Sequence, residues 1–165
     1  MAELWDIYDS SRRLTGRTVE RGKPMAADEF HIAVQVWVRN SRGEWLISRR
    51  TPNKPNPLKW EPSGGSVLAG EDSLSGAVRE VREELGIQLD PKKGRLCFSY
   101  RWGISFPGDS AGFMDVWLFE HDCPIEAVTL QEGETCGAMW VDTDTLHRME
   151  SNGELTPFSY PIPPN

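Results

Sequence analysis

The stretch that decides the fold is residues 65–87, GSVLAGEDSLSGAVREVREELGI. Apolar residues recur within it at the spacing of one helix face over residues 73–85. These residues are Leu74, Ala77, Val78, Val81 and Leu85. Ser73 or Asp72 is suited to cap the start of this helix, and Gly86 is suited to end it, because glycine adopts a left-handed turn at low cost. The stretch therefore predicts an amphipathic helix that is preceded by a loop.

Three glutamates on this helix, Glu80, Glu83 and Glu84, occupy positions i, i+3 and i+4. At about 100° per residue they fall within a sector of about 100°, beside the apolar face. Carboxylates this close repel one another. A divalent cation removes that repulsion and gains the oxygen ligands that Mg²⁺ prefers. The alternative is a solvated acidic face that Arg79 and Arg82 balance.

The same residues fit a longer pattern, G-x5-E-x7-R-E-U-x-E-E-x-G-U, in which U is an aliphatic residue. The matching positions are Gly65, Glu71, Arg79, Glu80, Val81, Glu83, Glu84, Gly86 and Ile87. Its fixed identities would coincide by chance at roughly one position in 10⁸. Residues 65–87 therefore resemble the signature box of the Nudix hydrolases.

In that family the box is a loop–helix–loop that holds Mg²⁺ or Mn²⁺, so the resemblance implies such a cofactor here. Glu83 and Glu84 match the main metal ligands. Glu80 matches a residue that acts as a ligand or as the base for the attacking water. Arg79 matches the arginine that orients the glutamates. The resemblance thus implies that these four residues carry the catalysis.

Residues outside the helix complete the implied metal site. Gly64, just ahead of the box, matches a residue whose carbonyl oxygen binds metal, and Glu71 matches a mainly structural acid. The family often takes one further acid from a loop beyond the central strands. Glu134 resembles that acid in position, Glu132 competes with it, and Glu120 is a third candidate. For each of these three the alternative is an ordinary solvated position.

Runs of β-branched and aromatic residues predict strands on either side of the box. We expect strands at 31–39 and 44–49, joined as a hairpin, and at 95–104, 112–120 and 138–141. Residues 51–65 predict a long functional loop, Asp142 or Thr143 can cap a short helix, and residues 157–165 predict an irregular tail. The pattern indicates one α/β or α+β layered domain over residues 1–165. The resemblance implies the Nudix α/β/α sandwich with a mixed central sheet.

The composition narrows the class of partner. The formal net charge of −7 repels a phosphate backbone at long range, so we expect no nucleic-acid polymer as a partner. The sequence has no apolar leader and no stretch near the roughly 20 apolar residues of a membrane span. Three separated cysteines predict reduced thiols: Cys97, Cys123 and Cys136. We expect a cytoplasmic protein with no membrane partner. The oligomeric state stays open, although dimers are common in this family.

The substrate that the resemblance implies is a small phosphorylated molecule, usually a nucleoside diphosphate linked to another group. Candidate contacts are the cations and the tryptophan before the box: Arg49, Arg50, Lys54, Lys59 and Trp60. Three other aromatic residues fit either stacking on a base or a core position: Trp102, Phe106 and Phe113. Structural roles fit the remaining polar residues of interest: His31, Asp72 and Asp115.

Two other functions remain as alternatives. Segments WDIYDSSRRLTGRTVERG, EFHIAVQVWV and LISRRTPNKPNPLKW resemble the branch related to isopentenyl-diphosphate isomerase, which moves a double bond. Those isomerases use a cysteine just before a degraded box, whereas this chain has EPSGG at 61–65 and a complete box. The second alternative is a nucleotide-binding module without activity, which usually lacks box glutamates. The intact box favours a metal-dependent hydrolase that cleaves a diphosphate linkage.

Overall fold

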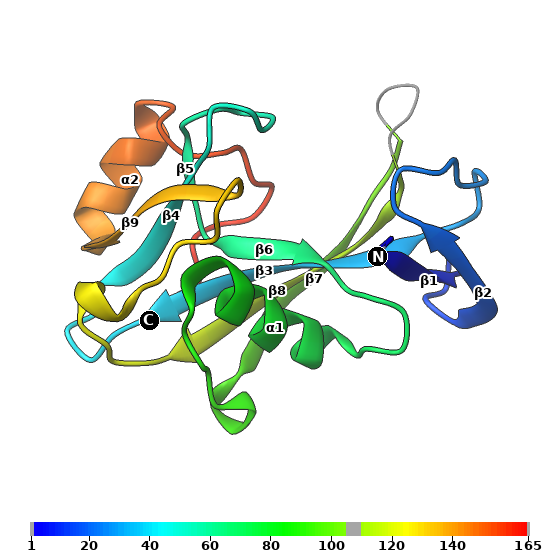
Figure 1. Cartoon of the computed structure of the whole chain (residues 1–165), viewed down its shortest axis with the longest axis horizontal. Helices are drawn as coiled ribbons and strands as arrows, with labels where there is room; N and C mark the ends of the chain where they lie inside the picture. Colours follow the sequence, from blue (N-terminus) through cyan, green and yellow to red (C-terminus); the bar gives the residue numbers. More distant parts are fainter. Residues whose placement is uncertain (1, 105–109, 165) are drawn as a thin grey trace.

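The computed structural model describes residues 2–104 and 110–164, and its centre is a mixed β-sheet (Figure 1). The strands of this sheet are β3 (His31–Arg39), β4 (Trp45–Arg50), β5 (Trp60–Glu61), β6 (Ser63–Ser66), β7 (Arg95–Trp102), β8 (Gly112–Glu120) and β9 (Thr135–Val141). They follow the order β5-β4-β3-β8-β7, and β6 also pairs with β3 while β9 pairs with β4. β3 and β8 run parallel along their whole length, whereas the other pairs are antiparallel. The mixed central sheet is therefore confirmed.

A helix covers each face of the sheet. The side chains of β3 alternate between the faces: Val34 and Val36 enter the hydrophobic core under α1 (Ser73–Leu85), and Trp37 enters a second core under α2 (Thr143–Ser151). Burial on both faces explains why β3 is apolar almost throughout. The layers are helix, sheet and helix, as the resemblance implied.

The expected hairpin of residues 31–39 and 44–49 is confirmed, and its two strands pair only beside the turn. β3 and β4 pair at Val38–Leu46 and Arg39–Trp45, beyond which β3 pairs with β6. Residues 51–65, expected to be one loop, consequently include β5 and β6. Ser63–Ser66 has no β-branched residue. It becomes a strand because the backbone groups of β3 require hydrogen-bond partners there.

Both helices begin at capping residues that the sequence offers, and α1 also ends at its expected glycine. The side chain of Asp72 accepts a hydrogen bond from the Ser75 amide at 2.7 Å, and Gly86 ends α1 in the left-handed region with φ of 69°. Asp142 caps α2 in the same way. The buried apolar side chains of α1 are Ala77, Val81 and Leu85.

The N-terminal residues form a hairpin that the sequence did not indicate. β1 (Leu4–Tyr8) and β2 (Leu14–Glu20) are antiparallel and make a separate two-stranded sheet. In Figure 1 this hairpin lies beside the loop that leads into α1, away from α2. The Ala69 amide in that loop donates to the Leu4 carbonyl at 2.7 Å. The N-terminus thus becomes a neighbour of the box.

The remaining segments are short helical turns and loops. The 3-10 turns η1 (Pro91–Lys93) and η2 (Ile125–Ala127) precede β7 and β9. Residues 157–164 form neither helix nor strand, so this part of the tail is irregular as expected, although Tyr160 packs into the second core. Among the described residues, no helix has the length and apolar character that crossing a membrane requires.

Candidate active site

Two glycines let the box helix approach the sheet closely. Gly64 and Gly65 in β6 pair with Gln35 and Val34 of β3. A Cβ added to Gly65 would lie 2.4 Å from the carboxylate of Glu80, and one added to Gly64 would lie 2.4 Å from the Val34 carbonyl oxygen. A larger residue at Gly64 would push β6 and β3 apart, and one at Gly65 would displace the Glu80 carboxylate. The glycine pair therefore brings a helix carboxylate directly against the backbone of β6.

Arg79 ties the acids of the box to one another. Its guanidinium donates to Glu71 at 2.8 Å, to Glu80 at 2.9 Å and to Glu83 at 3.0 Å. It also donates to the Ser66 carbonyl oxygen at 2.9 Å. Burial lowers the pKa of Arg79, but the bonds to Glu71 and Glu80 outweigh that effect, so its pKa lies above the usual value. Arg79 is thus a fixed cation that positions carboxylates from the loop and the helix.

Glu84 is the most buried acid of the box, with 7% of its surface exposed. Burial, and then the charges of Glu80 and Glu61, raise the pKa of Glu84 to about 8. The Gly64 amide, which donates to Glu84 at 3.3 Å, lowers this pKa only in part. Burial likewise raises the pKa of Glu80. Buried acids with this little compensation favour the approach of a cation.

Glu61, at the end of β5, is an acid of this site that the sequence did not single out. Its carboxylate accepts from Arg50 Nη1 at 2.7 and 3.0 Å. Burial raises the pKa of Glu61, and its charge in turn raises that of Glu84. The pairing of β5 and β6 with different strands brings it to the box helix. Its place in the segment that runs into the box was the only sequence signal.

The loop before β9 carries the candidate additional acids. A backbone amide of this loop donates to the Glu84 carbonyl oxygen at 3.1 Å, so the loop lies against the end of α1. The Glu134 side chain forms an ion pair with Lys54, and Glu132 is exposed. Glu120 lies at the far end of β8, away from the box. The structure therefore keeps Glu134 and Glu132 as candidates and removes Glu120.

The donor atoms around Glu84 suit a hard divalent cation. Glu61, Glu80 and Glu84 offer carboxylate oxygens, and Gly64 offers a backbone carbonyl oxygen on the adjacent strand. Among the described residues, no three acidic, histidine or cysteine side chains are already grouped as ligands. Arg79 holds the carboxylate of Glu80. A cation would therefore compete with Arg79 for its ligands as it binds.

Only one of the predicted substrate contacts lies where it can face these acids. Arg50 lines the cleft next to β6. Lys54 is ion-paired with a loop acid, and Lys59 and Arg49 donate to backbone carbonyls at 2.6 and 2.9 Å. The guanidinium of Arg49 lies 5.7 Å from the centre of the Trp60 ring. These side chains, like Arg50 with Glu61, already have partners within the fold, but only Arg50 among them lines this cleft.

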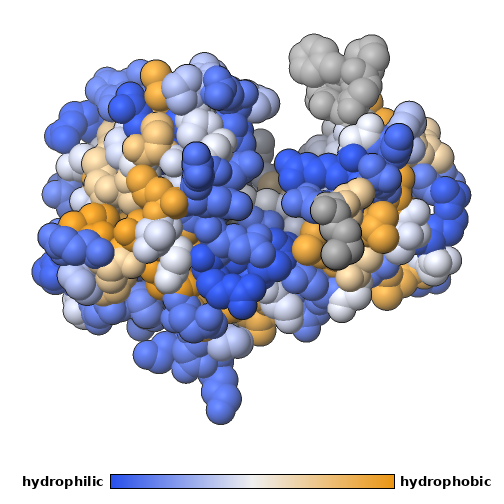
Figure 2. Space-filling model, viewed as in Figure 1, coloured by the Kyte–Doolittle hydropathy of each residue, from blue (hydrophilic) through white to orange (hydrophobic). Residues whose placement is uncertain are grey.

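The cleft has a volume of about 320 Å³ and adjoins β6. It is lined at one end by residues of the box and of β4 and β5, and at the other end by aromatic residues of β1, β3 and β7. Figure 2 shows the molecule hollowed in this region, between the flank that carries α2 and the flank that carries the hairpin. Its lining includes Glu61, Gly64 and Gly65 together with the rings of Trp5, His31 and Trp102.

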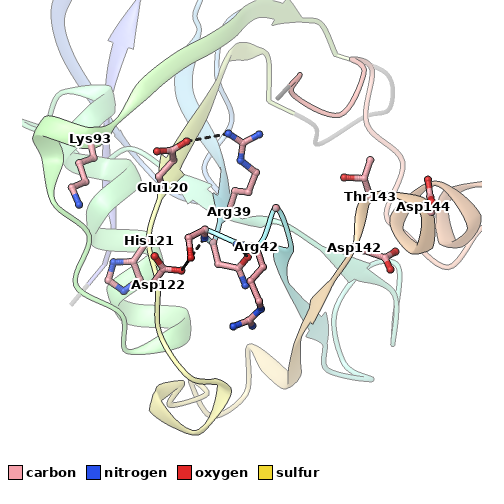
Figure 3. A pocket seen from close by; sticks show the side chains of 12 residues that line it. Arg39, Arg42, Lys93, Glu120, His121, Asp122, Asp142, Thr143 and Asp144 are labelled. Atoms are coloured by element: carbon pink, nitrogen blue, oxygen red, sulfur yellow. Dashed lines mark hydrogen bonds and ion pairs between the residues drawn. The ribbon is translucent and has the colours of Figure 1, made fainter.

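A larger hollow of about 980 Å³ lies at the other end of β3 (Figure 3). Some of its charged groups pair with their neighbours: Arg39 with Glu120 at 3.0 Å, and Asp122 with the Ser41 amide at 2.8 Å. No residue of the segment 65–87 is among the described residues that line it. We therefore place the site in the smaller cleft.

The aromatic and polar residues of interest fall into different environments. Trp102 lines the cleft, Phe113 lies in the first core, and Phe106 is outside the described residues. Asp115 is buried in an ion pair with Arg12, in keeping with a structural role.

Comparison with known proteins identifies the family. The sequence model of the NUDIX domain matches residues 29–162. The chain belongs to the Nudix family. An uncharacterised Nudix hydrolase of Listeria monocytogenes is 37% identical over 160 residues, which cover 96% of this chain and 90% of the relative. The chain is therefore a Nudix pyrophosphohydrolase.

Two further Nudix comparisons bear on the fold and the branch. The crystal structure of DR0079 from Deinococcus radiodurans has a TM-score of 0.71 at 24% identity and covers 93% of this chain and 91% of its own, so the fold is shared. An isopentenyl-diphosphate Delta-isomerase of Corynebacterium diphtheriae is 28% identical over 172 residues, covering 96% of this chain and 87% of the relative. The resemblance to the isomerase branch therefore has a counterpart among the relatives.

Proposed function

We propose that this Nudix enzyme hydrolyses a diphosphate linkage in a small substrate of the nucleoside diphosphate-X type, with Mg²⁺ or Mn²⁺ as its cofactor. The observation that carries the proposal is the burial of Glu84 against β6, with Glu80 and Glu61 close enough to raise its pKa. Acids so placed are costly without a cation, and a cation beside a cleft can receive a phosphate.

The proposed ligands are the acids of α1 together with a backbone oxygen of β6. Glu83 and Glu84 would hold the cation with the Gly64 carbonyl oxygen, and Glu134 would complete the set from its loop. Glu80 would act as a further ligand or as the base for the attacking water. Glu132 is the alternative to Glu134. Such a cation, when bound, neutralises charge on the phosphate oxygens and activates the attacking water.

The chain's own side chains supply the rest of the proposed chemistry. Glu80 accepts the proton of the attacking water, and Arg79 keeps that carboxylate in place through its bond at 2.9 Å. Arg50, at the edge of the cleft, offers a guanidinium to a phosphate oxygen. Glu61 holds Arg50 in this position through the two bonds at 2.7 and 3.0 Å.

An isomerase remains the second candidate because of the similar isomerase among the relatives. The three cysteines are free thiols, as expected. Among the described residues that line the cleft none is a cysteine, and Cys97 packs at the second core instead. The cleft therefore supports hydrolysis better than double-bond migration.

The test of the proposed function is a substrate screen with Mg²⁺ and with Mn²⁺. The panel contains nucleoside di- and triphosphates, sugar nucleotides, dinucleotides and isopentenyl diphosphate, with phosphate release and product identity as readouts. We expect cleavage of at least one diphosphate linkage, and its loss in excess chelator. Turnover that is unchanged in excess chelator, or isomerisation without cleavage, would contradict the proposal.

Glu84→Gln tests the role of Glu84 in activity without destabilising the protein. We expect turnover to fall at least about 100-fold, because the variant removes a charged ligand. The melting temperature should not fall, because the neutral amide avoids the burial of a charge. Glu126→Gln, at an exposed position in η2, tests whether a glutamate replacement is harmful in itself. Full activity of Glu84→Gln would contradict the assignment.

A further inference from the structure

Gln35 is a polar residue in the middle of an otherwise apolar central strand. It interrupts the apolar run from Ile32 to Val38 in β3, and its side chain projects toward the same face of the sheet as Trp37. The side chain is half-buried and lines the cleft beside β6. A polar amide at such a position is costly unless its donor and its acceptor are both used. The residues assigned to hydrolysis leave Gln35 without a role.

A tyrosine from the C-terminal tail binds the acceptor oxygen of this amide. Trp37 Nε1, which can only donate, bonds to the Tyr160 hydroxyl oxygen at 3.1 Å. The hydroxyl in turn donates to Gln35 Oε1 at 2.6 Å. Burial raises the pKa of Tyr160, so the hydroxyl keeps the hydrogen that it donates. The three side chains therefore form a chain of hydrogen bonds that runs in one direction, from Trp37 to Gln35.

This chain of bonds sets the orientation of the Gln35 amide. In the opposite orientation Nε2 would face a hydroxyl that already accepts from Trp37, and the phenol hydrogen would lose its acceptor. Nε2 is therefore directed away from Tyr160. Within residues 2–104 and 110–164, Gln35 Nε2 makes no hydrogen bond and is not one of the buried unpaired atoms. Gln35 thus presents an accessible, unused donor to the cleft that it lines.

Gly64 leaves space beside this donor. It lies directly opposite Gln35 in the pairing of β3 with β6, and a Cβ added to it would lie 3.2 Å from the Gln35 Cα. The Gly64 amide donates to Glu84 at 3.3 Å, so the backbone groups of Gly64 point away from β3. The two residues are then a non-hydrogen-bonded pair, with Cα atoms about 4.5 Å apart and the closest approach of facing side chains. Because Gly64 has no side chain, it leaves the Gln35 amide uncovered.

The location of the donor suits the diphosphate part of a substrate. The Gly64 carbonyl oxygen is a proposed ligand of the cation, so a diphosphate bound to that cation lies one strand away from Gln35. Arg50 lines the same cleft, but Glu61 already accepts two of its hydrogen bonds. A neutral amide can donate to a phosphate oxygen without competing for the acids that bind the cation. Gln35 therefore supplies a contact that Arg50 alone does not.

We propose that Gln35 binds an oxygen of the substrate's diphosphate through Nε2, and that Tyr160 positions the Gln35 amide for this contact. The assignment rests on the proposed function, because it requires the diphosphate to lie beside Gly64. Tyr160 acts only through Gln35. The irregular C-terminal tail thereby takes part in binding the substrate.

Calorimetric titration with methylenediphosphonate in Mg²⁺ tests the contact without turnover. Gln35→Met has a similar size but no donor, and its affinity should fall at least about 5-fold, as expected for loss of a hydrogen bond to a charged oxygen. Gln35→Glu keeps an oxygen for Tyr160 and replaces Nε2 by an acceptor, so it should lose at least as much affinity. Gln88→Met, at an exposed glutamine after α1, is the matched control and should bind as wild type does.

Tyr160→Phe tests the positioning role in a double-mutant cycle with Gln35→Met. The affinity should fall by about 2- to 3-fold when Gln35 is present, because an amide that is free to turn presents Nε2 for only part of the time. It should not fall further when position 35 is methionine. The melting temperature should fall in both backgrounds, since Trp37 Nε1 loses its acceptor in each. Tyr100→Phe, which removes a hydroxyl from a ring packed against Tyr160, is the control and should keep the wild-type affinity.

The outcomes separate this assignment from the proposed function. Equal affinities of wild type and Gln35→Met overturn the contact, even if the enzyme hydrolyses a diphosphate in the screen. An equal effect of Tyr160→Phe in both backgrounds overturns the positioning role. Failure of wild type to bind the probe overturns the contact alone if the screen shows turnover, and overturns the proposed function with it if the whole panel is inert.

Discussion

At the scale of single residues, the charged side chains of the site differ in how many hydrogen-bond partners they have without a cation. Arg79 donates to three carboxylates and a backbone carbonyl, whereas Glu84 accepts a long bond from the Gly64 amide and a contribution from the Ser63 side chain that together do not offset its burial. The same burial thus has opposite consequences for the two residues. Burial raises the pKa of Glu84, whereas the carboxylates around Arg79 outweigh the effect of burial on the pKa of its guanidinium. We expect Arg79 to position ligands and Glu84 to bind the cation.

Arg79→Lys should lower turnover by about 10- to 100-fold and raise the Mg²⁺ concentration needed for half-maximal activity. Lysine keeps the charge but cannot make the fork-like contacts that join loop, strand and helix. The measurement is activity as a function of Mg²⁺ concentration. Arg82→Lys, on the exposed side of the same helix, is the control. Indistinguishable Mg²⁺ curves for Arg79→Lys and wild type would refute the positioning role.

Glu134→Gln should lower turnover by about 10-fold, and Glu132→Gln should not, if Glu134 is the loop acid. The ion pair of Glu134 with Lys54 is partly exposed, so its loss should change stability by no more than about 1 kcal/mol. Turnover with saturating Mg²⁺ and a thermal melt of both variants check this. The reverse order of activities would transfer the role to Glu132.

At the scale of elements, glycines decide how closely the box helix fits its surroundings. Gly64 and Gly65 remove Cβ atoms between β6 and its neighbours, and Gly86 turns the chain sharply after α1. Thr129, from a later loop, packs against Gly86. The helix is therefore held at its side and at its end by positions that exclude larger residues.

Gly86→Ala should destabilise the protein by more than the roughly 1–2 kcal/mol that a left-handed alanine costs. The added Cβ would also meet the Thr129 Cβ at 3.0 Å. Gly43→Ala is the matched control, because its φ of +79° is similar but nothing lies within 4 Å of its Cβ. Urea unfolding of both variants measures the difference. Equal losses of stability would show that the contact with Thr129 has no effect.

At the scale of the whole molecule, the N-terminal hairpin, the sheet and the box meet at His31. Its ring is 3% exposed, stacks on Trp5 from the hairpin and lies beside the cleft. Burial lowers the pKa of His31 from 6.5 to about 4, with the nearby charge of Arg21 adding to the effect. In the unfolded chain the ring takes up a proton near pH 6.5. The unfolded state therefore binds more protons between those two values.

His31 and the buried acids make opposite contributions to the pH dependence of stability. The contribution of His31 is fully present above its unfolded pKa and is lost as the pH falls toward about 4, amounting to about 2 kcal/mol between pH 7 and pH 5. The raised pKa of Glu84 stabilises the folded state as the pH falls, so the test is a difference: between pH 7 and pH 5, urea unfolding should show wild type and His121→Gln losing about this much stability relative to His31→Gln. The same slope in His31→Gln and wild type would rule out His31 as its source.

The sequence alone was sufficient for the features that depend on neighbours within a few residues. The helix at 73–85, the cap at Asp72, the end at Gly86 and the strands 31–39 and 112–120 follow from periodicity and turn chemistry, and the structure confirms them. The roles of Glu80, Glu83 and Glu84 stay predictions, as does the single domain over 1–165. Their spacing on one turn of helix made them candidates without any tertiary information.

Only the tertiary structure decided what depends on distant segments. It placed Glu61 near Glu84, made a strand of the glycine-rich segment Ser63–Ser66, and brought Trp5 to the same cleft as Trp102. No local sequence pattern predicts these neighbours. They are brought together by pairing between strands that are far apart in the sequence, whose backbone groups must form hydrogen bonds with one another. The sequence therefore determined the chemical groups at the box, and the pairing of the sheet determined which other groups surround them.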